Sequence, residues 1–325
     1  MPILIIATVC FSLAALCMGQ YSLSVHQVIQ ILMGNGANVT NGAVVIFRVR
    51  IPRICMSLIC GAGLAVAGAA FQALFSNPLA TADTLGCANG ASFGAALGIL
   101  LGFHSFGVEI SALLFGMFSV VLVFLVTKTK GNENRSMMMI ILGGMVISTL
   151  FSSLVSLIKY VADPNDVLPV ITFWLMGSFS NATMKSLLQA GGIILAGILL
   201  LYMMRYRLNI LSLSEEEAKS LGVDMKKSRA IVILSASMIT ASVVSMCGVI
   251  GWVGLLIPHI ARMLFGNNNV RVIPACIVIG ALFMVVVDTF ARCVTAAEIP
   301  VSILTSVIGA PVFLLLLRKT GGIRS

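Results

Sequence analysis

Long apolar segments without charged residues recur along the whole sequence, and they limit the possible folds more than any other feature. A helix needs roughly 20 such residues to cross the hydrocarbon core of a bilayer, and backbone groups unpaired in lipid are so costly that spanning segments are helical. We therefore predict an all-α, polytopic integral membrane protein, a single domain over residues 1–325. It contains about ten transmembrane helices, some broken by glycine or proline. The predicted spans lie near residues 2–19, 51–73, 84–102, 108–127, 137–158, 186–204, 229–248, 250–265, 272–291 and 299–317.

The charge distribution indicates a topology. Charged residues make up only 10% of the chain, against about a quarter in soluble domains. With a cytoplasmic N-terminus, fourteen of the 20 lysine and arginine residues fall on the inner side of the predicted spans and six on the outer side. This is the cytoplasmic bias of positive charge in membrane proteins. We predict a multi-pass protein of the cell membrane (the inner membrane in an organism with two), in contact with lipid and not with nucleic acid. Both termini are expected in the cytoplasm.

The longest polar stretch, residues 205–229, holds 10 of the 31 charged residues, counting 20 basic and 11 acidic ones. It is also patterned, because Ser212 or Ser214 can cap a short helix and Gly222 can end it. A disordered linker would need no such pattern. The stretch is either a solvated loop or an ordered cytoplasmic element on which a soluble partner docks, and the pattern favours docking.

Small residues dominate the second and third predicted spans. Gly90, Gly94, Gly98 and Gly102 recur at every fourth position, which predicts a face where helix backbones approach closely in lipid. Residues 75–86, between these spans, include Pro78, which breaks the helix. Asp83 lies near the inner edge of this break, and we expect it to cap the next helix rather than to act within the membrane.

Hydroxyl side chains follow one face of two other predicted spans. Ser148, Ser152 and Ser156 recur at every fourth position of the span 137–158, and Ser302 and Ser306 do so in the last span. Each hydroxyl can bond back to its own helix. Alternatively, these faces line a polar path through the membrane, and the sequence leaves both interpretations open.

Three arginines are predicted on the outer side, where the charge bias disfavours them. Arg50 and Arg53 flank Pro52 at the start of the second span, and Arg292 ends the ninth. Asp288, four residues before Arg292, can form an ion pair with it. Arginines at a membrane surface commonly anchor lipid headgroups, but their position against the bias favours another role.

The sequence carries no motif for catalysis or for energy conversion. It has no G-x-x-x-x-G-K-[ST] phosphate loop, no H-E-x-x-H pair and no nucleophile with its base. The eight cysteines include no C-x-x-C pair, so we predict no metal site and no cofactor bound by this chain. An ion-coupled secondary transporter is the alternative from another class. It is disfavoured because Asp83, Glu109 and Asp288 all lie near span ends, not within the membrane interior.

Several segments together resemble the FecCD family, the permease subunits of ATP-binding cassette importers for iron siderophores, haem and vitamin B12. The segments are RIPR at 50–53, QALFSNPLATADTLG at 72–86, FWLMGSFSNA at 173–182, LNILSLSEEEAKSLGV at 208–223, GVIGWVGLLIPHIAR at 248–262 and AEIPVSILTSVIGAPVFLLLLRK at 297–319. Their order and spacing match over essentially the whole chain. The match is specific for the family and not for the cargo.

The resemblance implies a transport subunit that is not itself an enzyme. Energy would come from two cytoplasmic ATP-binding subunits, which hold ATP and Mg²⁺. A second permease copy or a paralogue, and an extracytoplasmic substrate-binding protein, complete the implied assembly. The cargo expected first is an iron(III)-siderophore complex, with haem or cobalamin as the alternatives.

The resemblance also assigns three sets of site residues. The residues implied to couple to the ATP-binding subunits are Leu213, Glu215, Glu216, Ala218, Leu221 and Gly222. Those implied to dock the binding protein are Arg50, Arg53 and Arg292. The helices implied to line the translocation pathway carry Ser148, Ser152, Ser156, Ser302, Thr305 and Ser306.

Overall fold

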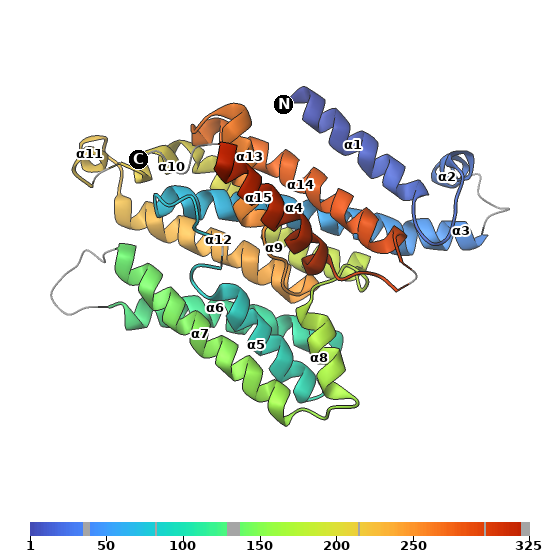
Figure 1. The fold of residues 1–325 in the computed structure, drawn as a ribbon. Coiled ribbons are helices and arrows are strands. Elements are labelled where there is room, and N and C mark those ends of the chain that lie inside the picture. The colour runs from blue at the N-terminus through green and yellow to red at the C-terminus, as the bar shows by residue number, and fades with distance from the viewer. Residues whose placement is uncertain (35–39, 82, 129–136, 214, 296, 320–325) are drawn as a thin grey trace.

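The computed structural model of the chain describes residues 1–34, 40–81, 83–128, 137–213, 215–295 and 297–319. Every regular element within these residues is a helix, which confirms the predicted all-α class (Figure 1). The elements are α1 (Pro2–Cys17), α2 (Val25–Leu32), α3 (Thr40–Val44), the π-helix η1 (Val45–Arg50), α4 (Ile51–Leu74), α5 (Cys87–Leu100), α6 (Ser105–Val126), α7 (Met137–Val161), α8 (Val167–Leu175), α9 (Met184–Met203), α10 (Arg205–Leu211), α11 (Glu215–Ser220), α12 (Met225–Cys247), α13 (Val253–Phe265), α14 (Asn269–Cys293) and α15 (Val301–Lys319).

Six helical segments in the described residues are long and apolar enough to cross a membrane. They are Asn41–Leu74, Ser105–Val126, Met137–Val161, Met184–Met203, Met225–Cys247 and Asn269–Cys293, and each coincides with a predicted span. The four other predicted spans coincide with the shorter apolar helices α1, α5, α13 and α15. Helices α5 and α13 are short because irregular backbone precedes them, which a membrane protein tolerates where protein surrounds it.

Helix α4 is buried along almost its whole length and packs against α9, α12, α13 and α14. Glycines allow this close packing. A Cβ atom added to Gly61 would lie 2.2 Å from the carbonyl oxygen of Gly280 on α14. A Cβ atom added to Gly68 would lie 1.9 Å from the carbonyl oxygen of Gly254 on α13. Close backbone approach of this kind holds helices together in lipid, where apolar burial alone gives no driving force.

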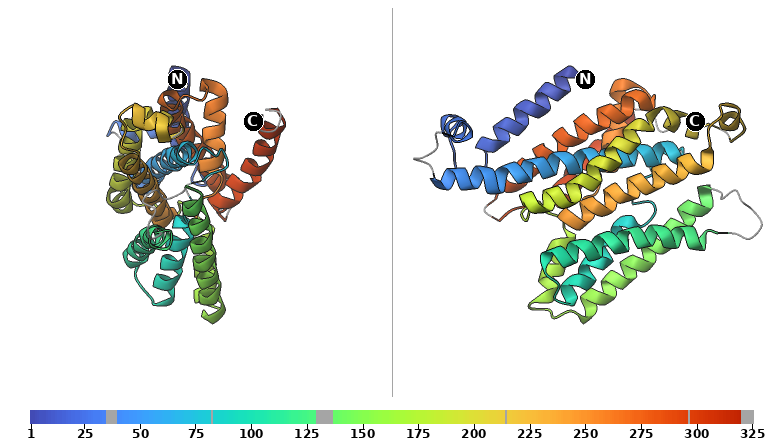
Figure 2. Two further views of the ribbon diagram at one scale, coloured as in Figure 1. Left: turned by 90° about the vertical axis from the view of Figure 1, so that its left-hand side faces the viewer. Right: turned by 180° about the vertical axis from the view of Figure 1, so that it is seen from behind.

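Helices α5, α6, α7 and α8 gather on one side of the bundle, next to α12 (Figures 1 and 2). The expected glycine face joins α5 to α6. A Cβ atom at Gly90 would lie 2.7 Å from the Phe115 carbonyl oxygen, and one at Gly94 would lie 2.3 Å from that of Ser111. Gly98 also faces α6, whereas Gly102 has no atom within 4 Å and adopts a φ of +73° after the end of α5. The fourth glycine therefore ends the helix and is not part of the packing face.

The two predicted breaks appear where expected. After α4 the chain turns through Pro78, and Asp83 Oδ1 accepts a hydrogen bond from the backbone N–H of Ala88 at 2.9 Å, so its predicted capping role is confirmed. Before α13, Trp252 adopts a φ of +68°, which is uncommon for a residue with a side chain. Trp252 packs against α15. A Cβ atom added to Gly309 on α15 would lie 2.8 Å from the Cβ atom of Trp252.

We expect Gly94→Leu to destabilise the protein by about 1–3 kcal/mol, because an added side chain must push α5 away from the backbone of α6. The midpoint of thermal unfolding in detergent should fall accordingly. The matched control is Gly192→Leu on α9, where no atom lies within 4 Å of the added Cβ. Equal midpoints for the two variants would contradict the packing role of Gly94.

Candidate functional site

The hydroxyl stripe of α7 lies on an open face of the bundle. Ser152 and Ser156 are exposed, and Ser148 is half-buried. Ser156 donates to the Ser152 carbonyl oxygen at 3.1 Å, while Ser148 Oγ accepts a 2.6 Å hydrogen bond from Asn89 on α5. The same face is therefore exposed and carries hydroxyls that bond back to their own helix. Bonding back to the helix and lining a polar path do not exclude each other. A hydroxyl that bonds back keeps a lone pair for a passing solute.

The second stripe, on α15, is only partly accessible. Ser302 and Ser306 are half-buried, but Thr305 is fully buried and its hydroxyl donates to the Ser302 carbonyl oxygen at 3.1 Å. The assignment of Thr305 to an open pathway surface is therefore corrected, since its side chain lies on the packed side of α15. The spacing of the hydroxyl residues predicts that they share one face of α15, but it does not predict whether that face points toward the bundle or away from it.

Helix α15 contacts the rest of the bundle at separate points along its length. Its first residue, Val301, donates its backbone N–H to the Gly177 carbonyl oxygen at 2.9 Å. Farther along, the Phe313 ring packs edge-on against Trp252. Among the described residues, the helix pairs that pack extensively do not include α7 with α15, and the two helices diverge in the side view of Figure 2. One chain alone therefore does not close a path between the two stripes.

Arg53 is buried at the predicted outer end of α4, with 3% of its surface exposed. Its Nε donates to Asp288 Oδ1 on α14 at 2.9 Å. Its Nη1 donates to both carboxylate oxygens of Glu298, at 2.8 and 2.9 Å. The guanidinium thus joins α4, α14 and the segment before α15. Asp288 forms its ion pair with Arg53 and not, as expected, along its own helix with Arg292.

The two other arginines hold the end of α1. Arg50 donates to the carbonyl oxygens of Leu16 and Tyr21, and Arg292 Nη2 donates to that of Ala15 at 2.6 Å. The last carbonyl groups of a helix have no partner within it, so such donors stabilise its end. Helix α1 ends at Cys17, which makes these arginines the caps of its last turn.

These contacts bear on the predicted docking role of the three arginines, because they leave little of each side chain at the surface. Arg50, Arg53 and Arg292 are only 3%, 3% and 5% exposed, and each guanidinium bonds within the chain. A buried cation must be paired or hydrogen-bonded to be tolerated. In this conformation the three side chains tie helices together and are not presented to a partner.

The polar stretch at the predicted inner end forms two helices: α11, which corresponds to the predicted short helix, and α10 before it, which the pattern did not predict. Ala218 is fully buried, whereas Leu213 and Leu221 are 44% and 58% exposed. Gly222 adopts a φ of +70°, and the N–H of Val223 bonds the Ala218 carbonyl oxygen at 3.4 Å, so Gly222 ends α11 as predicted. The two exposed leucines lie on either side of α11, where their side chains are available for contact with another protein.

Not every expected residue of this stretch can be placed. The side chains of Glu215 and Glu216, and the whole of Ser214, lie outside the described part of the chain. Ser212 donates its hydroxyl to the Asn209 carbonyl oxygen, three residues back, at 2.7 Å, a contact at the end of α10.

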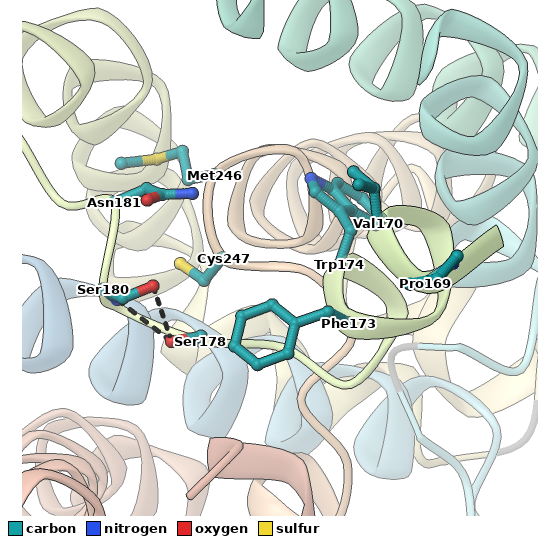
Figure 3. Close-up of a pocket in the computed structure, with 9 residues that line it drawn as sticks. All are labelled: Pro169, Val170, Phe173, Trp174, Ser178, Ser180, Asn181, Met246 and Cys247. Atoms are coloured by element: carbon teal, nitrogen blue, oxygen red, sulfur yellow. Dashed lines mark hydrogen bonds between the residues drawn. The ribbon is translucent and has the colours of Figure 1, made fainter. Parts of the chain in front are cut away.

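A cavity of about 390 Å³ at the predicted outer end was not anticipated from the sequence (Figure 3). One wall is apolar and comes from α8, with Phe173 and Trp174. The other wall comes from residues 178–181 and the end of α12. Ser178 donates its N–H to the Cys247 carbonyl oxygen at 2.8 Å, which holds this wall in place. Within the described residues no group of three histidine, cysteine or acidic side chains could hold a metal ion.

Replacing Asp288 by Asn leaves Arg53 without its fully buried counter-charge. We expect a loss of about 3–5 kcal/mol in unfolding free energy, the usual cost of breaking one side of a buried ion pair. Glu298→Gln is the matched comparison and should cost less, because the Glu298 side chain is 31% exposed and solvent already weakens its charge. Thermal unfolding in detergent measures both. A larger loss for Glu298→Gln would contradict this ranking.

Comparison with known proteins agrees with the fold. A solved structure described as an inward-facing conformation of a putative metal-chelate type ABC transporter superposes with a TM-score of 0.88 at 42% identity, covering 97% of both chains. The molybdate import system permease protein MolB of Haemophilus influenzae is 44% identical over 322 residues, 98% of this chain and 94% of the relative. A probable iron chelatin transport system permease protein of Helicobacter pylori is 34% identical over 86% of this chain and 84% of its own length. The model of the FecCD transport family matches residues 4–319, and the chain therefore belongs to this family.

Proposed function

We propose that the chain is the membrane-spanning permease subunit of a binding-protein-dependent importer energised by separate ATP-binding subunits. The observation that carries the proposal is the family match over residues 4–319, together with relatives named as permeases over most of their length. The sequence has no phosphate-binding loop of its own, so ATP and Mg²⁺ would be held by the partners.

In this proposal two permease copies, or the chain and a paralogue, face each other across the path. The open hydroxyl face of α7, with Ser152 and Ser156, and the half-buried Ser302 and Ser306 on α15 would line it. Support comes from the separation of α7 and α15 within the described chain, which leaves both helices available to a second copy.

The substrate-binding protein would dock at the outer end. Arg53 remains the proposed contact, but a carboxylate of the binding protein reaches it only by replacing Glu298, which is its more exposed partner. Arg50 and Arg292 would support this contact by holding α1.

Residues 205–229 would carry the contact with the ATP-binding subunits, which places this stretch and both termini in the cytoplasm. The exposed Leu213 and Leu221 supply apolar contact area, and the turn at Gly222 sets the direction of α11. The expected coupling residues Glu215, Glu216 and Ala218 lie on the same short helix. The excess of lysine and arginine on the side of the membrane that holds residues 205–229 supports the cytoplasmic location of this stretch.

Gly222→Leu should disturb the docking of the ATP-binding subunits on this stretch. A side chain at φ +70° costs about 1–2 kcal/mol, which favours another direction for α11. In vesicles holding the complete transporter, uptake and cargo-stimulated ATP hydrolysis should fall together, while membrane insertion stays normal.

The matched control is Gly34→Leu, which adds the same side chain at a φ of +80° on the opposite side of the predicted membrane, with no atom within 4 Å. It should leave both activities near normal. Normal coupling in the Gly222→Leu variant would mean that α11 is only a linker and would remove the structural basis for this proposal.

For the cargo, we propose a compact oxyanion of the molybdate class as the first candidate, because the relative named for molybdate shares 44% identity over 98% of this chain. This replaces the iron(III)-siderophore complex as the first choice. The siderophore stays the second candidate, since the iron chelatin relative shares 34% identity, and haem or cobalamin follow from the family resemblance.

Cargo identity is tested on the substrate-binding protein that functions with this permease. Isothermal titration with molybdate, and separately with ferric siderophores, should show tight binding of molybdate only. Tight binding of a ferric chelate and none of molybdate would restore the second candidate without affecting the assignment as a permease.

A further inference from the structure

A second cavity, of about 270 Å³, lies at the predicted inner end and has no role in the function proposed so far. It forms where the end of α4 and the turn after it meet the end of α13, the start of α14 and the residue that follows α10. Its described lining residues are Gln72, Ala73, Ser76, Asn77, Pro78, Ser212, Arg262, Asn267 and Asn269.

Arg262 gives this cavity a positive charge. Its Nη1 donates to Gln72 Oε1, and Gln72 in turn donates to the Gly254 carbonyl oxygen at 3.4 Å, so the guanidinium is held in position. Its other N–H groups make no hydrogen bond or ion pair with the described residues. None of the nine described lining residues is acidic. The cation therefore faces the cavity without a counter-charge.

Asn269 adds a second polar side chain to the wall of the cavity. It is 5% exposed, and its side-chain Oδ1 is buried without a partner among the described residues. Its backbone N–H is held by Asn209 Oδ1 at 2.9 Å, which fixes the residue at the wall. A buried polar group left unpaired is costly, and such groups in native proteins are nearly always satisfied. A half-turn of the amide presents NH₂ as a donor in place of the oxygen.

The lining as a whole is rich in donors. Asn77 and Asn267, with their side-chain amides, and Ser76, with its hydroxyl, line the same cavity as Arg262. Such a set, with one cation and no acid, matches an anionic oxygen group, because arginine binds carboxylates and oxyanions through paired N–H donors. The chemistry is therefore that of a carboxylate or of a small oxyanion.

The position of the cavity favours a carboxylate from a protein. Ser212, which forms part of the wall, lies between α10 and α11, so the cavity opens beside the stretch assigned to the ATP-binding subunit. We propose that this cavity receives a carboxylate side chain of the ATP-binding subunit, which pairs with Arg262 when the subunit docks on α10 and α11. The inference rests on the proposed function and adds a charged anchor to it.

The test is the affinity of the complete permease, in lipid nanodiscs, for its ATP-binding subunit, measured over a salt series. Arg262→Met should weaken binding about 10-fold or more and flatten the salt dependence, since one partner of a desolvated charge pair is lost. Arg271→Met is the matched control: Arg271 is an exposed arginine of α14 outside the cavity. It should bind as the unchanged protein does.

Arg262→Met also removes the hydrogen bond to Gln72, so weaker binding could come from a disturbed fold. A second variant separates the two causes. Asn269→Asp keeps that bond and the size of the side chain but places a negative charge in the cavity. It should also weaken binding, with a thermal unfolding midpoint that shows the protein is folded. Unchanged affinity in both variants would overturn the anchor while leaving the proposed function intact. No binding of the ATP-binding subunit by the unchanged permease would overturn both.

Free anions form the other arm of the test. Millimolar phosphate or molybdate, compared with chloride at equal ionic strength, should not displace the ATP-binding subunit. Specific displacement that disappears in Arg262→Met would show that the cavity binds a free oxyanion and would overturn the assignment to a protein carboxylate.

Discussion

Backbone contact between glycines is the interaction on which the rest of the structure depends. Gly61 against Gly280 and Gly68 against Gly254 bring α14 and α13 onto α4 with no side chain between them. Because lipid tails are as apolar as the helix surface, moving that surface from lipid into a helix contact gains little free energy. Close packing must therefore supply the attraction between the helices. These contacts fix a core around α4, and the surrounding helices, the buried arginines and the cavity at Arg262 are positioned relative to it.

The periphery is attached to this core in a different way. Helix α15 is held through Arg53 and Glu298, through a backbone hydrogen bond to Gly177 and through the packing of Trp252. These are few contacts, and part of the ion pair is open to solvent. A transporter that must open and close needs elements whose attachment can change while the core stays packed. Helix α4 belongs to the packed core, whereas α15 is attached by few contacts, so the two helices differ in this way.

Local patterns made much of this fold predictable. The apolar spans, the glycine face at Gly90 and Gly94, the cap at Asp83 and the turn at Gly222 each depend on residues close in sequence. The burial of Arg53 could not be predicted, because its partners Asp288 and Glu298 are 235 and 245 positions away. The direction in which Thr305 faces, and both cavities, likewise depend on how separate helices pack. The inner cavity joins residues from α4, α13 and α14, which no single segment reveals.

The proposed function requires that this chain move its cargo with energy supplied by a partner and without ion coupling of its own. The most direct measurement is cargo accumulation in proteoliposomes that contain the permease, its ATP-binding subunit and its binding protein. Uptake should require ATP and the binding protein and persist when proton and sodium gradients are collapsed. Uptake by the permease alone, driven by an imposed ion gradient without ATP, would contradict the account and identify a secondary transporter.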